Sequence, residues 1–189
     1  MAKKTGKTYK TTAGEVVYGM MAEFATPADT YKAAEKMRDA GYRKWDVYSP
    51  FPIHGIDEAM GLPNSKLPLT VGVIGLTGAA IGFAFQYWVS TSGYATVVQG
   101  KPLGAWQALI PVTFEIGVLF TAFTAILSML AFNTLPMWYH PLFKKDRFLR
   151  VSDDRFVICV ESKDANFDPV KTKQTLESAK GYNVELVEE

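Results

Sequence analysis

The sequence predicts an α+β membrane protein in which a two-helix transmembrane hairpin is inserted between two βαβ halves of one cytoplasmic domain. Charged residues are dense before Lys66 and after Lys144, but no Asp, Glu, Lys or Arg occurs from Leu67 to Gly100. Similar strand and helix signals occur on both sides of the apolar region. The apolar runs therefore indicate membrane spans, and the repeated signals indicate the folded domain.

Two apolar runs are long enough to cross a bilayer. The first, residues 67–90, would form a helix about 36 Å long, and the second covers residues 106–135. Aromatic residues flank both ends of the hairpin, as is typical of membrane interfaces: Tyr87, Trp88, Tyr94 and Trp106 at one end, and Trp138 and Tyr139 at the other. An alternative interpretation, buried helices of a soluble protein, accounts less well for these lengths and flanks.

The positive charges predict a two-pass protein of the bacterial cytoplasmic (inner) membrane with both termini in the cytoplasm. The periplasmic connector, residues 91–105, contains only Lys101, whereas basic residues are frequent on both flanks of the hairpin. Residues 1–14 are lysine-rich and have no apolar h-region, so we expect a basic flexible tail rather than a cleaved signal peptide. Residues 136–154 are predicted to form a basic linker at the membrane interface.

Small residues in the first span predict close helix packing. Gly72, Gly75, Gly78 and Gly82 recur at intervals of three or four residues. Such spacing forms a groove that another helix backbone can approach, although each glycine weakens the helix itself. The helix that fills the groove is either the second span or a helix of another protein.

The two flanking segments share one pattern of strands, caps and turns. In residues 15–62, a strand over 16–24 precedes a helix that begins at Thr26-Pro27 and ends at Gly41, and a second strand covers 43–48 before a short helix. In residues 155–189, a strand, a helix opened by Asp168-Pro169 and a final strand follow in the same order. Two such βαβ halves predict one ferredoxin-like cytoplasmic domain.

Composition excludes several classes of function. The net charge of +1 gives no basis for nucleic-acid binding. The single cysteine, Cys159, forms no disulfide framework, haem c attachment motif or iron–sulfur ligand set, and we expect it in the domain core. His54 and His140 lie on opposite sides of the apolar region. We therefore expect no cofactor in this chain, and no catalytic constellation is visible.

Five stretches carry a family resemblance. YGMMAEFATP, AGYRKWDVYSPFPIHGIDEAMGL, GFAFQYW, IPVTFEIGVLFTAF and LPMWYHPLF resemble the D-type subunit of alternative complex III, a bacterial quinol:electron-acceptor oxidoreductase. The similarity extends from about Val16 to the region of Asp168. It implies a cofactor-free accessory subunit in the membrane, bound to large multi-helix integral subunits. It also implies periplasmic partners, a cytochrome subunit with haem c and a subunit with iron–sulfur clusters.

Glu115 is the one charged residue between Pro102 and Phe143. A carboxylate in a bilayer is costly unless it is paired, protonated or hydrated, and Gln86 of the first span is a candidate neighbour. Glu115 is therefore either an anchor to a partner subunit or part of a proton path. Without the resemblance, the alternative function is a free-standing membrane regulator with a ligand-binding ferredoxin-like domain.

Overall fold

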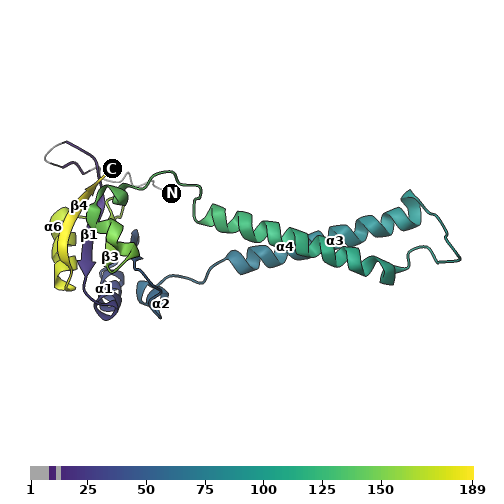
Figure 1. The fold of residues 1–189 in the computed structure, drawn as a ribbon, viewed down its shortest axis with the longest axis horizontal. Coiled ribbons are helices and arrows are strands. Elements are labelled where there is room, and N and C mark those ends of the chain that lie inside the picture. Colours follow the sequence, from purple (N-terminus) through teal and green to yellow (C-terminus); the bar gives the residue numbers. More distant parts are fainter. Residues whose placement is uncertain (1–8, 12–13) are drawn as a thin grey trace. The chain divides into compact units, whose positions relative to one another are not determined.

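The computed structural model describes residues 9–11 and 14–189 of the chain (Figure 1). The chain divides into two compact units. One unit, here called the globular unit, runs to Pro63 and resumes with Trp138–Glu189. The other, the hairpin unit, is Asn64–Met137. The apolar hairpin is thus inserted into the sequence of an α+β unit.

The globular unit contains a four-stranded sheet with the strand order β2-β3-β1-β4. All three neighbouring pairs are antiparallel, so strands of the first half alternate with strands of the second. Neither half could form this sheet alone. The elements are β1 (Val17–Phe24), α1 (Pro27–Asp39), β2 (Trp45–Tyr48), α2 (Ile56–Met60), η3 (Pro141–Lys144), α5 (Asp146–Leu149), η4 (Arg150–Ser152), β3 (Phe156–Glu161), α6 (Pro169–Ser178) and β4 (Tyr182–Glu188).

The predicted helix starts are confirmed by their caps. The Thr26 hydroxyl accepts a hydrogen bond from the backbone N–H of Asp29 at 3.1 Å, and Pro27 opens α1. The Asp168 carboxylate accepts bonds from the N–H groups of Val170 and Lys171, each at 3.0 Å, at the start of α6. These side chains satisfy backbone donors that a helix leaves unpaired in its first turn.

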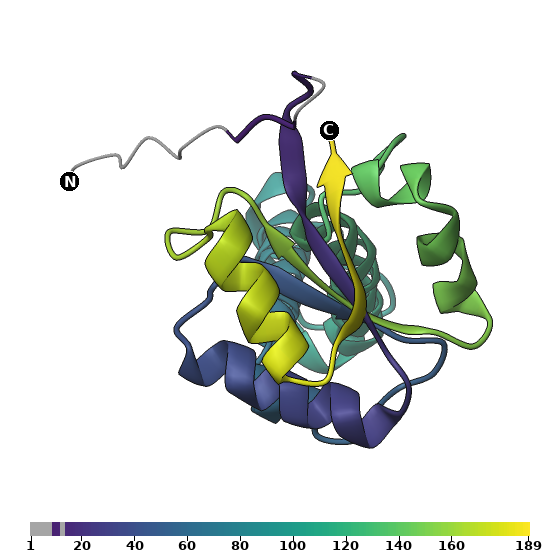
Figure 2. The ribbon, with the colours of Figure 1, turned by 90° about the vertical axis from the view of Figure 1, so that its left-hand side faces the viewer.

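The two faces of the sheet are covered differently. Helices α1 and α6 lie together on one face (Figure 2), over an apolar core that includes Met20, Phe24, Met37, Ile158 and Leu176. Segment 141–152 contributes Leu142, Phe148 and Val151 to the second face, where they pack with Met21 and Cys159. Cys159 is 3% exposed. The segment expected to be an interfacial linker therefore supplies buried residues to the core.

Part of the expected N-terminal tail contacts the globular unit. The Tyr9 hydroxyl donates to the Phe167 carbonyl at 3.0 Å, and the two rings pack edge to face. Lys10 forms an isolated bridge with Val16. Residues 9–11 are thus held against the sheet, while the rest of the predicted tail up to residue 13 lies outside the described residues.

The hairpin unit contains two antiparallel helices, α3 and α4 (Figure 1). Helix α3 (Leu67–Trp88) continues into the π-helical turn η1 (Val89–Gly93), and the 3-10 turn η2 (Trp106–Leu109) leads into α4 (Ile110–Phe132). Both helical segments are long and apolar enough to cross a membrane. Helix α4 ends three residues before the predicted end of the second span at residue 135, where Thr134 has a φ of 53°.

Large apolar side chains on the hairpin are exposed within this chain. Leu69, Leu76 and Phe114 retain 71%, 75% and 69% of their accessible surface. Helices in the core of a soluble protein would bury such residues, because exposed apolar area of this extent is unfavourable in water. The exposure therefore favours a lipid or protein environment for the hairpin.

Candidate functional site

Three of the four glycines predicted for packing form the contact between α3 and α4. Gly75 lies against Thr121, Gly78 against Phe120, and Gly82 against Ile116. A Cβ atom added at Gly78 would lie 2.5 Å from Phe120 Cγ, and one at Gly82 would lie 2.8 Å from Ile116 Cδ1. The second span thus fills the glycine groove. Gly72 lies outside this contact, with nothing within 4 Å of its added Cβ.

Gln86 forms a polar link between the two helices. Its Nε2 donates to the Thr113 hydroxyl at 3.2 Å and to the Gly82 carbonyl at 3.0 Å. The Thr113 hydroxyl in turn donates to the Leu109 carbonyl at 2.8 Å. The polar neighbour of Gln86 across the hairpin is therefore Thr113 rather than Glu115.

Glu115 lies on the side of α4 that faces away from α3. The residues of α4 that contact α3 include Thr113 and Gly117, and Glu115 is two positions from each, a rotation of about 200° around the helix. Its side chain is exposed, and no described residue forms a hydrogen bond or ion pair with it. Pro111, Leu119 and Ala122, also exposed, belong to the same side of the helix. The hairpin leaves this carboxyl group without a partner of its own.

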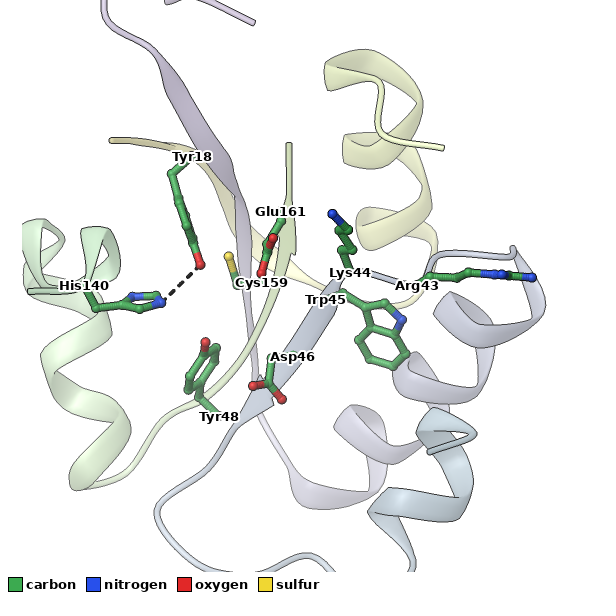
Figure 3. Close-up of a pocket in the computed structure, with 9 residues that line it drawn as sticks. All are labelled: Tyr18, Arg43, Lys44, Trp45, Asp46, Tyr48, His140, Cys159 and Glu161. Atoms are coloured by element: carbon green, nitrogen blue, oxygen red, sulfur yellow. Dashed lines mark hydrogen bonds between the residues drawn. The ribbon is translucent and has the colours of Figure 1, made fainter. Parts of the chain in front are cut away.

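A second candidate site is a hollow of about 430 Å³ on the open part of the second sheet face (Figure 3). Three strands supply its side chains, because alternate residues of a strand point to the same face. The lining residues are Tyr18 from β1, Asp46 and Tyr48 from β2, Cys159 and Glu161 from β3, His140 before η3, and Arg43, Lys44 and Trp45 at the start of β2. Sequence patterns alone did not bring these residues together.

His140 positions Tyr18 in the hollow. The His140 Nδ1 accepts a hydrogen bond from the Leu142 backbone N–H at 3.3 Å, and its Nε2 lies 3.1 Å from the Tyr18 hydroxyl. A ring whose Nδ1 accepts carries its proton on Nε2 when neutral, so Nε2 donates to the Tyr18 oxygen. The Tyr18 hydroxyl proton is then free to be donated to another group.

The hollow disfavours additional negative charge. Burial, together with the charge of Glu161, raises the pKa of Tyr18 to about 12. The same two causes, with Asp46, raise the pKa of Cys159 to about 12. Burial is also the main cause of the raised pKa of Asp46, with a contribution from Glu161, while the Val47 N–H and His140 oppose it. Tyr18 and Cys159 therefore keep their protons near neutral pH.

Asp164 connects the two halves of the globular unit. One carboxylate oxygen accepts from the backbone N–H groups of Arg43 and Lys44 at 2.7 and 2.6 Å, and the other accepts from the Asn166 N–H at 2.7 Å. The predicted strand over 43–48 therefore begins only at Trp45, since these two N–H groups bind a side chain. Sequence reasoning missed this residue because two of its three partners, Arg43 and Lys44, are more than 100 positions away.

Other residues considered from the sequence lie outside both sites. His54, Asp57 and Glu58 are exposed near or on α2. The basic residues after the hairpin are partly engaged within the globular unit, as in the 3.0 Å pair of Lys145 with Glu188. Within residues 9–11 and 14–189, no three His, Cys, Asp or Glu side chains are placed to hold a metal ion.

Comparison with known proteins identifies one family. A family model described as "Alternative complex III, ActD subunit" matches residues 18–186. The comparison with curated proteins gave no match. The matched range contains the hairpin, Glu115 and every residue that lines the hollow.

Proposed function

The chain belongs to the ActD subunit family of alternative complex III, and on that premise we propose that it is an accessory membrane subunit that stabilises the large integral subunits of the complex. The observation that carries this proposal is the position of Glu115. Helix α4 packs against α3 on one side, and the Glu115 carboxyl group lies on the opposite side of α4.

A partner subunit would complete that side of α4. A charged side chain costs about 2.5–3.5 kcal/mol at the centre of a membrane helix on insertion scales and less toward its ends, and such residues normally face a partner or a hydrated cavity. Glu115 is the sixth residue of α4, in the half of the helix next to the connector. Because α3 does not meet Glu115, the partner would be a donor group on another integral subunit. Glu115 would thus act as an anchor, with Pro111, Leu119 and Ala122 providing the surrounding contact surface.

The proposal includes a two-pass arrangement with both termini in the cytoplasm. The antiparallel course of α3 and α4 brings the first and last residues of the hairpin to the same membrane side. The connector on the other side contains only Lys101, which supports an external connector by the positive-inside rule. The alternating strands and the two helices on one sheet face support a ferredoxin-like cytoplasmic domain.

The redox groups would belong to the partners. We expect haem c in a periplasmic cytochrome subunit and iron–sulfur clusters in another, with quinol oxidation at the large integral subunits. Proton movement through Glu115 is a second candidate role, favoured by its unpaired carboxyl group. A relay normally needs further proton-carrying groups, and the hairpin offers one carboxylate, so anchoring is the simpler role.

Removal of the chain tests the stabilising role. A strain that lacks this subunit should yield much less intact complex after mild detergent extraction, measured by haem absorbance and by the amount of the large integral subunits. Re-expression of the tagged wild-type chain should restore both, and the partners should co-purify with it. An intact, equally stable complex without the chain would contradict the proposal. Recovery of the tagged chain as a homo-oligomer without a chromophore would favour the free-standing regulator.

A further inference from the structure

Within the globular unit, the second sheet face is only partly covered. Segment 141–152 buries Met21, Val157 and Val187, but the hollow beside it remains open. Helices α1 and α6 cover the opposite face (Figure 2), whereas polar side chains of this region line the hollow (Figure 3). The globular unit by itself therefore leaves this region of the sheet uncovered.

Two carboxylates that line the hollow, those of the exposed Asp46 and the half-buried Glu161, form no ion pair with any described residue. Cys159 lies opposite Asp46 in the β2–β3 register, and Glu161 is two positions further along β3, so both carboxylates point to the same face. Arg43 and Lys44 line the rim, yet no described residue forms an ion pair with Asp46 or Glu161. Some other acids of the globular unit are paired, for example Asp29 with Lys180 at 2.9 Å, whereas exposed acids such as Asp57 and Glu58 form no ion pair among the described residues.

The buried Glu23 lies on the same sheet face and, unlike Asp46 and Glu161, forms ion pairs within the chain. Its side chain is 4% exposed and lies 3.8 Å from both Arg147 and Arg155. Two guanidinium groups thus flank one carboxylate at one end of the face, whereas the carboxylates of Asp46 and Glu161 at the other end form no ion pair, although Arg43 and Lys44 also line the hollow. These two carboxylates are acceptors for a further positive charge.

The remaining walls of the hollow also fit a cation. The rings of Tyr18 and Tyr48 line it, and aromatic faces attract ammonium and guanidinium groups. Burial raises the pKa of both tyrosines, so both side chains are neutral at neutral pH and offer a cation only their ring faces and hydroxyl oxygens. The Cys159 thiol lies at the floor, 3% exposed, without a hydrogen-bond partner among the described residues. A volume of about 430 Å³ accommodates the end of a lysine or arginine side chain.

We propose that the hollow receives a lysine or arginine side chain of another subunit of the complex, held between the carboxylates of Asp46 and Glu161 and against Tyr18 and Tyr48. This inference rests on the proposed function, because it requires a neighbouring subunit. The site would fix the globular unit to a partner independently of the hairpin.

Carboxyl labelling tests the site directly. The purified complex and the full chain purified alone in the same detergent are treated with a carbodiimide and glycine ethyl ester, and modified peptides are quantified by mass spectrometry. A paired cation excludes the reagent, so Asp46 and Glu161 should be modified about five-fold less in the complex, with the exposed Asp57 and Glu58 as reference positions. Without the added amine, a carbodiimide cross-link from either residue to a partner lysine would support the proposal further.

Equal modification in the complex and in the chain alone would overturn the proposal. Protection of the chain alone, through self-association or in anionic lipid nanodiscs without partners, would overturn it as well. These outcomes leave the subunit role intact, because that role is judged by co-purification. The chain alone is checked for folding by the slow reaction of its buried Cys159 with a maleimide.

Matched variants give a second readout. The double variant Asp46→Asn, Glu161→Gln keeps the size of both side chains and removes their charge. Its complex should lose the chain at a salt concentration that the wild-type complex withstands, with about three-fold less chain retained. The control Asp57→Asn, Glu58→Gln should behave as wild type. Equal retention of the hollow variant and the wild type would contradict the proposed pairing.

Discussion

The hairpin and the globular unit each have one side that is packed against other residues of the same unit and one side that is not covered in this way. In the hairpin, α3 and α4 meet through three glycines and the Gln86–Thr113 hydrogen bond, while Glu115 lies on the opposite side of α4. In the globular unit, α1 and α6 close one sheet face, while Asp46 and Glu161 stand unpaired on the other. The two units share this division, although one is a pair of helices and the other is a sheet covered by helices.

The packed sides are apolar in both units, and Glu115, Asp46 and Glu161 lie on the other sides without an ion pair. Asp164, by contrast, accepts hydrogen bonds from three backbone N–H groups of the chain itself. Under the proposed function, the acids in the hollow and on α4 mark surfaces that another subunit would complete. Substitutions in the packed contacts should therefore lower stability or assembly more than substitutions of the acids without an ion pair.

The largest effect should come from filling the glycine groove. Gly78→Leu places a side chain where Phe120 already lies, so the two helices must separate. We expect the amount of chain in the purified complex to fall about ten-fold or more, because overpacking costs about 1–3 kcal/mol and the rest of the hairpin contact is lost with it. Quantitative immunoblotting of the isolated complex measures this.

Gly72→Leu is the matched control for the groove. It adds the same side chain to the same helix at a position with nothing within 4 Å. Wild-type amounts of this variant are expected if α4 is the sole partner of the groove. An equal loss for both variants would show that the effect arises from the helix itself and not from the α3–α4 contact.

A smaller effect, a loss of folding stability, should follow from neutralising Asp164, an acid that accepts hydrogen bonds within the chain. Asp164→Asn removes the charge that binds three backbone N–H groups and directs an amide group toward one of them. We expect a loss of about 1.5–3 kcal/mol and a fall of several degrees in Tm. Thermal unfolding of the full chain in detergent can be followed with a fluorogenic maleimide, since the buried Cys159 reacts only on unfolding. The exposed Asp153→Asn should leave Tm unchanged.

Neutralising Asp46, an acid without an ion pair, should raise the folding stability instead of lowering it. The pKa of Asp46 is raised by burial, so its charged form disfavours the folded state. Wild-type stability should then fall as pH rises from about 3.9, the ordinary pKa of aspartate, through the raised folded value. Asp46→Asn removes this dependence and keeps the acceptor for the Val47 N–H.

The predicted gain is small. At neutral pH, Asp46→Asn should raise the Tm of the isolated chain by no more than about 3 °C, and the difference should vanish below pH 4. The same maleimide assay at several pH values measures it. A lower Tm for this variant at neutral pH would show that Asp46 is already satisfied within the chain.

Local signals in the sequence were sufficient for the elements and for the hairpin. Thr26-Pro27 and Asp168-Pro169 predicted both long helices of the globular unit because a cap and its helix are adjacent in sequence. The apolar runs predicted α3 and α4 for the same reason. Three of four glycines were placed correctly against a helix, but Gly72 continues their spacing without sharing their contact.

The sites depend on contacts between distant residues. Sequence spacing placed Gln86 near Glu115, whereas the rotation of α4 directs Thr113 toward Gln86 and Glu115 away from it. The hollow joins residues from Tyr18 to Glu161, and only the sheet register brings them to one face. The segment 141–152 looked like a basic linker because its buried residues, Leu142, Phe148 and Val151, alternate with exposed charges.

The most direct test of the account compares two substitutions at Glu115 in the complete complex. Glu115→Gln retains hydrogen bonding and should give wild-type amounts of complex, whereas Glu115→Leu should leave the partner's donor unpaired and reduce the chain retained after mild detergent extraction about three-fold. Turnover and proton release of the Gln variant are measured on the same preparation, and unchanged values would exclude the relay role. Full retention of the Leu variant would contradict the claim that another subunit completes this side of the hairpin.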